Sequence, residues 1–141
     1  MNVVWGHPDL VVPFVMERIG LTRPFGHCQT AAVVSNDHKV AAGLVFHNWD
    51  PEHGVIEVSA AAIDPRWAQR GVLKEAFGYI FERAKCQLAV CRCHPKNKAV
   101  RRLWKSFGAD EYIIPRMRGR DAGECILTVT DDAWRASKFM R

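Results

Sequence analysis

The sequence predicts a single domain of the α/β class, residues 1–141, with a mixed sheet of about six to seven strands flanked by helices. The length of 141 residues is that of one ordinary domain. The 48% hydrophobic and 25% charged residues are near globular averages, which excludes disordered and fibrous proteins. Short β-branched runs alternate with helical periodicities. Strand–helix–strand connections favour parallel neighbours in the centre of a sheet, and hairpins favour antiparallel margins.

The first thirty residues predict one helix. Apolar side chains recur near helical spacing between Pro8 and Gly20, and a glycine is a common helix stop. Because a proline inside a helix removes a backbone hydrogen bond, Pro13 makes this helix either start late or bend.

Six apolar or β-branched runs predict the strands. Residues 30–35 and 40–47 form a predicted hairpin, since the Asn-Asp-His-Lys sequence between them is typical of a tight turn. Residues 55–63 form a third strand, bounded by Gly54 and Pro65. The other three strands are predicted at 87–93, 111–117 and 125–130. The last two are expected to form a hairpin.

Two further helices are predicted in the second half of the chain. Apolar residues fall on one stripe of a helix over residues 71–84. Residues 97–107 form the clearest helix, because apolar residues recur there at i, i+3, i+4 and i+7. Asn97 suits the N-cap of this helix, and Gly108 suits its C-terminal stop.

Basic charge is concentrated in the middle of the chain. The net charge is +5, but residues 64–120 carry 14 basic and 5 acidic side chains, while residues 1–63 and 121–141 are both net acidic. The basic segment suits a phosphate-bearing partner, either a nucleotide cofactor or nucleic acid, or else forms a solvated face. No recognised nucleic-acid motif accompanies it, so we do not expect a nucleic-acid partner.

Cysteine usage and the first residues predict a cytoplasmic protein. The five cysteines are an odd number, and the start of the chain lacks the basic stretch and apolar core of a secretory signal, so we expect reduced thiols. No apolar run approaches the roughly 20 residues of a membrane span, and no membrane partner is expected. Cys91, Cys93 and His94 cluster in the sequence without a second ligand pair at zinc-site spacing. We therefore expect no metal.

The turn after the third strand is a candidate anion site. Strand 55–63 passes through this turn to Gly71, where a helix begins, with Arg66 and Arg70 beside it. The first amides of a helix lack internal partners and the macrodipole adds positive charge, so a diphosphate can bind there. An ordinary strand-to-helix turn is the alternative. Neither the phosphate loop of nucleotide hydrolases nor the dinucleotide glycine fingerprint is present.

Three segments share a pattern with a known family. They are the strand and turn 55–67, the turn and helix 68–77, and the asparagine-led helix 97–108 that ends at glycine. With the element order over roughly residues 30–130, they resemble the general N-acetyltransferase (GNAT) superfamily. The helix led by asparagine is the most specific of the three.

The sequence departs from the family pattern at three positions. The phosphate turn of the family usually reads Arg/Gln-x-x-Gly-x-Gly/Ala, whereas the first and last of these positions here are Ala68 and Leu73. The family often has a tyrosine general acid seven residues after the asparagine. Trp104 stands at that position, and an indole is no useful acid for a thiolate.

The resemblance implies acetyl-CoA as the co-substrate, lying between strands 55–63 and 87–93. It implies that backbone groups of Ala61, Ala62 and Ile63 meet the pantetheine arm and the acetyl carbonyl. Asn97 would then face the pantetheine or the thiol. Main-chain amides would hold the diphosphate at Gln69, Arg70, Gly71, Val72 and Leu73.

Glu57 and Ser59 are the candidate catalytic residues. They share one face of an alternating strand, and a carboxylate on a mostly apolar strand must pair or lie in a wet cleft. The resemblance implies that Glu57 takes the amine proton through ordered water; a salt-bridged glutamate is the alternative. Ser59 either relays a proton or is a satisfied core hydroxyl. His47 and His53 flank the loop 48–54 and are either surface histidines or a base.

The resemblance thus implies an N-acetyltransferase in which a primary amine attacks acetyl-CoA directly. The acceptor is a protein N-terminus, a lysine or a small amine. A degenerate member that binds CoA or a partner protein without catalysis is the second interpretation, motivated by Ala68, Leu73 and Trp104. A basic nucleic-acid-binding module is the third. The short N-terminal region predicts that a second subunit completes the acceptor site, in a homodimer.

Overall fold

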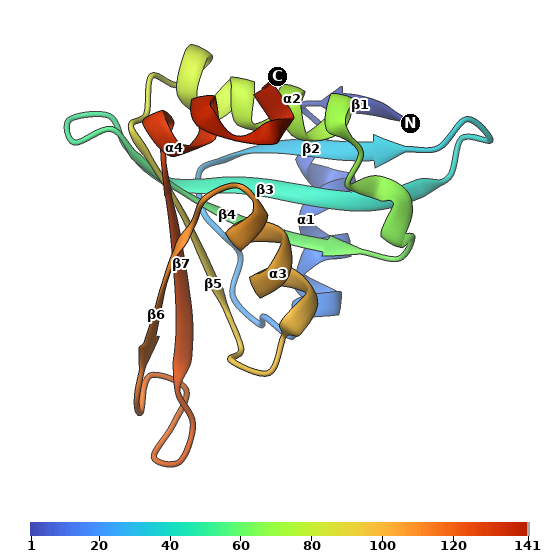
Figure 1. The fold of residues 1–141 in the computed structure, drawn as a ribbon. Coiled ribbons are helices and arrows are strands. Elements are labelled where there is room, and N and C mark those ends of the chain that lie inside the picture. The colour runs from blue at the N-terminus through green and yellow to red at the C-terminus, as the bar shows by residue number, and fades with distance from the viewer. Residues whose placement is uncertain (141) are drawn as a thin grey trace.

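Seven strands form one sheet in the computed structural model, which describes residues 1–140, and their order is β1-β2-β3-β4-β5-β7-β6 (Figure 1). This confirms the predicted mixed α/β class. The strands are β1 (Asn2–Trp5), β2 (Cys28–Val34), β3 (Val40–Asp50), β4 (Val55–Ala62), β5 (Leu88–Cys93), β6 (Asp110–Ile114) and β7 (Glu124–Thr130). The α-helices are α1 (Pro8–Ile19), α2 (Arg70–Gly78), α3 (Lys98–Ser106) and α4 (Asp131–Ala136). Single short turns of other helix types lie at Pro65–Trp67, Tyr79–Arg83 and Lys138–Met140.

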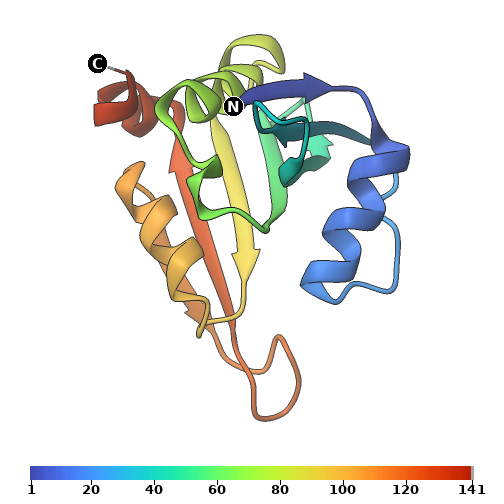
Figure 2. The same cartoon turned by 90° about the vertical axis from the view of Figure 1, so that its right-hand side faces the viewer.

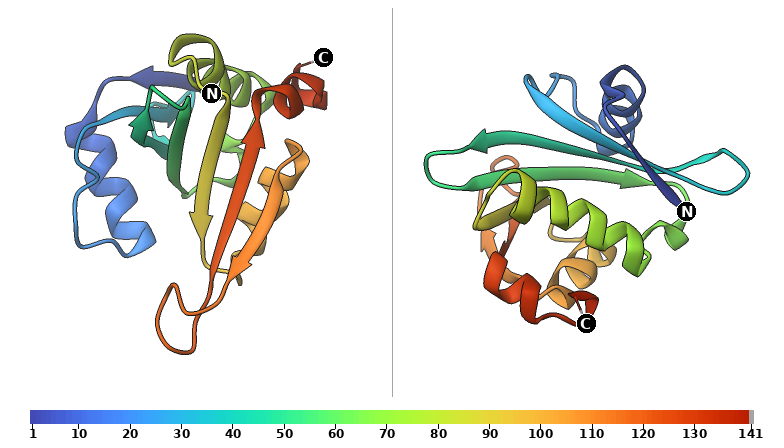
Figure 3. Two further views of the ribbon diagram at one scale, coloured as in Figure 1. Left: turned by 90° about the vertical axis from the view of Figure 1, so that its left-hand side faces the viewer. Right: turned by 90° about the horizontal axis from the view of Figure 1, so that it is seen from above.

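Helices cover both faces of the sheet. Seen from above, α1 lies on one side and α2 and α4 lie on the other (Figure 3). Helix α1 presses closely on β3, because a Cβ added at Gly43 would come within 3.1 Å of side-chain carbons of Phe14 and Val15. A side chain at this position would require these neighbours to shift by a few tenths of an ångström.

The opposite face is built around an aromatic cluster. The ring of Phe77 in α2 lies 4.6 Å from that of Trp134 in α4 and 4.8 Å from that of Phe107, which follows α3. Such stacked and edge-to-face pairs each add roughly 1 kcal/mol beyond the burial of area. The cluster joins the three helices to one another and holds the end of the chain against the domain.

Two elements were not predicted from the sequence, and both are short. Strand β1 pairs with β2 along four residues at the edge of the sheet. Helix α4 has six residues, one of which, Trp134, has a fully buried side chain. Neither segment is long enough to show a period, so their structure comes from packing against the rest of the domain.

Three predicted elements have different ends in the structure. The helix predicted over 71–84 changes after Gly78 into a π turn, in which the amide of Ala84 donates to the carbonyl of Tyr79 at 2.8 Å. Strand β3 continues to Asp50, beyond the predicted end. Strand β6 ends at Ile114, because the next residue is a proline without an amide to donate.

Strand β4 has two unlike neighbours. It pairs antiparallel with β3 from Val55 to Ala62, but its parallel pairing with β5 stops at Glu57 opposite Val90. Beyond this point β5, β7 and β6 turn away from β2, β3 and β4 (Figures 1 and 2). The sheet is therefore open at its centre, between β4 and β5.

No helix among residues 1–140 has the length and apolar character that crossing a membrane requires.

Candidate active site

A cavity of about 1050 Å³ lies where β4 and β5 diverge. Its walls come from both strands, from the segment between α1 and β2, and from α3. Residues of the two strands that line it are Glu57, Val58, Ser59, Ala60, Cys91, Arg92 and Cys93. The cavity therefore occupies the position that a continuous ladder between β4 and β5 would fill.

The alternation of β4 sends its side chains to two environments. Val58 is buried in the large core beneath α2 and α3, with Ala60 packed against that core. Glu57 and Ser59 point to the other face, toward α1, and both line the cavity. The predicted shared face of these two residues is thus present in the structure.

His47 of β3 links Glu57 to Ser59. Its Nε2 lies 2.9 Å from Ser59 Oγ and 3.6 Å from Glu57 Oε2. The imidazole is only 7% exposed and its ring centroid lies 4.6 Å from that of Phe25. The Asn48 amide donates to Glu57 Oε1 at 3.1 Å. Glu57, His47 and Ser59 form one polar cluster, hereafter the β3–β4 cluster, in which His47 and Ser59 are hydrogen-bonded and Glu57 lies beside them.

Burial decides the charge of His47. Desolvation lowers the pKa of His47 below its ordinary value, and the nearby Glu57 carboxylate opposes that shift. The imidazole is therefore neutral at neutral pH, and its Nε2 is able to accept or donate a hydrogen bond to Ser59.

The sequence placed His47 beside a loop, where a surface histidine was one of two interpretations. The structure buries it, because β3 runs past this residue and the antiparallel register sets it opposite Glu57. The available signal was the apolar run from Val40, which continues the strand period to His47. The second candidate, His53, is exposed, pairs with Asp50 at 2.8 Å and does not line the cavity.

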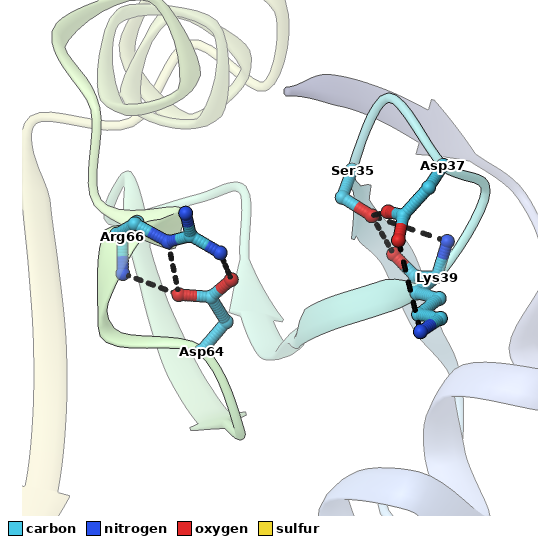
Figure 4. Close-up of polar contacts among 5 residues, drawn as sticks. All are labelled: Ser35, Asp37, Lys39, Asp64 and Arg66. Atoms are coloured by element: carbon cyan, nitrogen blue, oxygen red, sulfur yellow. Dashed lines mark hydrogen bonds and ion pairs between the residues drawn. The ribbon is translucent and has the colours of Figure 1, made fainter.

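The turn between β4 and α2 is ordered by an ion pair. The Asp64 carboxylate accepts from the backbone amide of Arg66 at 2.9 Å and from its guanidinium at 3.0 and 2.8 Å (Figure 4). This contact holds the pKa of Asp64 below its usual range. The guanidinium of Arg66 is thus directed to this carboxylate, and that of Arg70 donates to the carbonyl of Lys138.

The β2–β3 hairpin has a comparable turn at the same end of the sheet. The Ser35 hydroxyl contacts Asp37, and the Asp37 carboxylate lies 3.7 Å from the Lys39 ammonium (Figure 4). All three side chains are at the surface of the hairpin and outside the cavity. We regard them as turn-forming residues.

The first turn of α2 presents an open surface at Gly71. A Cβ added there would meet nothing within 4 Å, and the backbone does not adopt a left-handed conformation. The fold itself therefore does not require a glycine, whereas the close approach of a ligand to the main chain would. At the end of this turn the Leu73 amide donates to the Gln69 carbonyl at 2.9 Å. Gly71 and Val72 are then the amides best placed for an anion.

Asn97 and Trp104 are fixed by α3. The Asn97 side chain accepts from the Val100 amide at 3.2 Å, as expected of an N-cap, and the residue also lines the cavity. Trp104 is buried, with its ring 5.5 Å from that of Phe77. The tryptophan thus packs in the aromatic core while one part of it reaches the cavity wall.

The cysteines of β5 are unsuited to carry an acyl group. Burial raises the pKa of Cys93 to about 12, and it raises that of Cys91 as well. Both thiols are therefore protonated at neutral pH and are weak nucleophiles. Among residues 1–140, no three histidine, cysteine or acidic side chains are grouped so as to hold a metal ion.

The chain was compared with models of known protein families. Residues 5–109 match the family model described as the acetyltransferase (GNAT) family. The chain belongs to this family. The predicted GNAT resemblance is confirmed, and the match supports acetyl transfer in general as the chemistry of the domain. The family normally uses acetyl-CoA as its co-substrate.

Solved structures show the same fold at low identity. A GCN5-related N-acetyltransferase from Brucella melitensis is 26% identical, with a TM-score of 0.64 over 77% of this chain and 53% of that chain. A spermidine N-acetyltransferase variant from Vibrio cholerae is 10% identical, with a TM-score of 0.73 over 96% of this chain and 98% of that chain. The ribosomal-protein-S5-alanine acetyltransferase from Vibrio fischeri is 14% identical, with a TM-score of 0.62 over 76% of this chain and 63% of that chain.

These likenesses differ in what they cover. This GNAT chain spans about half the length of the Brucella protein and nearly all of the spermidine enzyme. At 10% and 14% identity, the two Vibrio structures show the fold alone. No curated protein matches the chain.

Proposed function

We propose that this protein transfers an acetyl group from acetyl-CoA to a primary amine by direct attack. The observation that carries the proposal is the opening between β4 and β5, which places the Glu57 carboxylate on the wall of a 1050 Å³ cavity. Acetyl-CoA supplies the activated thioester, and the chain supplies the site that holds it and the base that takes a proton.

The edge of β4 beyond Glu57 fits an extended arm of the donor. Backbone donors and acceptors on this edge have no partner strand on the β5 side, and such groups need hydrogen bonds from water or a ligand. Ala61 and Ala62 lie at its end, and Ile63, whose amide donates to the Ala41 carbonyl at 2.9 Å, follows them beside the turn to α2. In this proposal they meet the pantetheine and Asn97 faces it from α3.

The first turn of α2 holds the diphosphate in this proposal. Gly71 allows the anion to approach the main chain. The amides of Gly71 and Val72 lie at the N-terminus of α2, which is the positive end of the helix dipole. No acidic residue lies in this turn to repel it. Arg66 and Arg70 are held by other partners, so backbone donors carry most of the binding.

Glu57 takes the proton of the attacking amine. The amine nitrogen forms a bond to the thioester carbonyl carbon, the C–S bond breaks with its electron pair on sulfur, and the surplus proton leaves the nitrogen. The Glu57 carboxylate accepts this proton directly or through water, and general bases of this kind contribute roughly 10²–10⁴-fold to a rate. Neutral His47 holds Ser59 and faces Glu57, which keeps the carboxylate oriented toward the cavity.

Direct transfer is favoured over an acyl-enzyme. The cavity contains Cys91 and Cys93, but burial keeps both thiols protonated. A covalent intermediate would require one of them to ionise. The kinetic expectation is a ternary complex of both substrates with the enzyme and not a ping-pong pattern.

Release of free thiol from acetyl-CoA, followed across a panel of amines, tests the function. Turnover with at least one amine and its loss in Glu57→Gln are expected. The rival is a member of the family that binds CoA without catalysis, and the buried Trp104 at the tyrosine position favours it. Calorimetric binding of CoA without thiol release for any amine would establish that rival.

A further inference from the structure

The acceptor side of the cavity carries a surplus of positive charge. Four arginines line it, against two glutamates: Arg18, Arg23, Arg92 and Arg118, with Glu57 and Glu124. Glu57 is the base in the proposed function, and Arg18 has the Glu17 carboxylate 3.9 Å away, which leaves Glu124 to balance Arg23, Arg92 and Arg118. A cationic polyamine would meet repulsion here.

Two of these arginines share a single buried carboxylate. Arg92 Nη2 lies 3.2 Å from Glu124 Oε2, and Arg118 donates to Glu124 Oε1 at 3.0 Å through Nε. The Glu124 side chain is 5% exposed, whereas those of Arg92 and Arg118 are 42% and 38% exposed. The carboxylate fixes both guanidinium groups but neutralises only one of them. The cluster keeps a net positive charge toward the cavity.

Arg92 lies on the same face of the sheet as the catalytic candidates Glu57 and Ser59. Glu57 is the parallel partner of Val90, so these two side chains point to one face. Arg92 lies two residues after Val90 and therefore shares that face with Ser59, across the opening. The donor-binding turn of α2 follows the end of β4, and only Trp67 and Leu73 beside it line the cavity.

The last turn of α1 and the segment that follows it add charge from another part of the lining. The Arg18 guanidinium donates to the Phe14 carbonyl at 3.0 Å and lies 3.8 Å above the ring of Phe14. Arg23 is exposed and also lines the cavity. The cavity that the β3–β4 cluster lines therefore also carries guanidinium groups from two separate parts of the chain.

We propose that the acceptor is an amine that also bears an anionic group, a carboxylate or a phosphate, which Arg92 and Arg118 bind while the amine faces Glu57. This inference rests on the proposed function. Arginine binds both anions through paired N–H donors in a planar fork, so the chemistry of recognition is shared. Polyamines such as spermidine are excluded as preferred acceptors.

Matched amine pairs in the thiol-release assay test the proposal. L-Ornithine against putrescine adds a carboxylate, and O-phosphoethanolamine against ethanolamine adds a phosphate. We expect the anionic member of at least one pair to have a kcat/KM at least about 10-fold higher, the size expected of one hydrogen bond to a charged group. Equal or faster turnover of putrescine, ethanolamine and spermidine would overturn the inference while leaving the proposed function intact.

Variants of Arg92 test whether the preference for an anionic amine comes from the arginines that share Glu124. Arg92→Gln is expected to raise KM for the anionic amine about 10-fold, with little change in kcat, and to leave KM for acetyl-CoA unchanged. Arg92→Lys keeps the charge and is expected to retain part of the affinity. Arg102→Gln removes the same charge from an exposed site outside the cavity and serves as the matched control. A rise in KM for acetyl-CoA in Arg92→Gln would overturn the proposal, because the arginine would then serve the donor.

A binding measurement that needs no turnover distinguishes failure of the proposed function from failure of this inference. If no amine releases thiol, the proposed function fails, and calorimetry with O-phosphoethanolamine and with L-ornithine, each added to the CoA-loaded protein, decides the inference alone. Binding that Arg92→Gln weakens and Arg102→Gln does not weaken supports the anionic subsite. Absence of binding to the wild-type protein overturns it.

Discussion

The two edges of β4 serve different purposes. Toward β3 the strand is paired from Val55 to Ala62, and toward β5 it is paired only as far as Glu57. An unpaired edge inside a sheet is costly, because backbone donors and acceptors there lose hydrogen bonds. The paired edge holds the fold, and the open edge is available to a ligand. The candidate site of this GNAT domain therefore lies where pairing within its own sheet is interrupted.

The sharpest test of the open edge is at the turn that closes it. Gly71→Asp places a carboxylate where the diphosphate is proposed to lie, and we expect CoA affinity to fall about 100-fold or more, the loss of one to two hydrogen bonds to a charged group. The fold has room for the side chain. Calorimetric titration with CoA measures the effect.

Gly78→Asp is the matched control. It makes the same substitution in the same helix, at a position where an added Cβ also meets nothing within 4 Å. We expect wild-type CoA affinity, with a small loss of stability from a negative charge near the C-terminus of the helix. Equal loss of affinity in both variants would contradict a diphosphate site at Gly71.

Glu57 stands where the paired half of β4 gives way to the open half. Glu57→Gln keeps the side-chain shape and removes the base, so kcat is expected to fall about 100-fold while CoA affinity stays unchanged. Steady-state kinetics across pH 6–9 with a fixed amine measures this. An unchanged kcat and an unchanged pH profile would remove Glu57 from the proton route.

Ser59 offers a smaller perturbation of the same wall. Ser59→Ala removes a hydrogen bond to His47 that measures 2.9 Å, and it leaves the 3.6 Å contact between His47 and Glu57 in place. We expect kcat to fall severalfold at most, in proportion to one neutral hydrogen bond. A loss as large as that in Glu57→Gln would instead make Ser59 a proton donor or acceptor in the reaction.

The buried His47 makes the free energy of unfolding depend on pH. Burial lowers the pKa of His47, so the unfolded chain takes up a proton at a higher pH than the folded protein does. Its contribution to the free energy of unfolding is present above about pH 6.5 and is lost as pH falls toward the lower folded value. Urea titrations at pH 7.5 and pH 5 are expected to show a smaller pH-dependent loss in His47→Gln. An equal loss in both proteins would contradict the assignment.

Most of the fold could be predicted from local sequence patterns. The β2–β3 hairpin forms around the predicted turn, although its strands have other ends, and the capped helix α3 agrees with its predicted range, because turn chemistry, capping and periodicity act within a few residues. Strand β1 and helix α4 were not readable, since each is too short to show a period. Their stability comes from neighbours distant in sequence.

The site was readable only in part. Glu57 and Ser59 could be named as candidates because they interrupt an apolar strand. The role of His47 depends on the register between β3 and β4, and that of Arg92 and Arg118 depends on sharing the buried Glu124 across two strands. Register and cross-strand pairing are long-range properties, and a single sequence does not state them.

Amide hydrogen exchange with and without CoA tests the central claim most directly. Bound CoA is expected to slow exchange in residues 58–62 of β4 and at 70–72 at the start of α2, and to leave exchange in the β2–β3 turn at 35–39 unchanged. Calorimetry on the same samples establishes that the site is saturated. Saturation without slower exchange in residues 58–62 would contradict an open strand edge as the donor site.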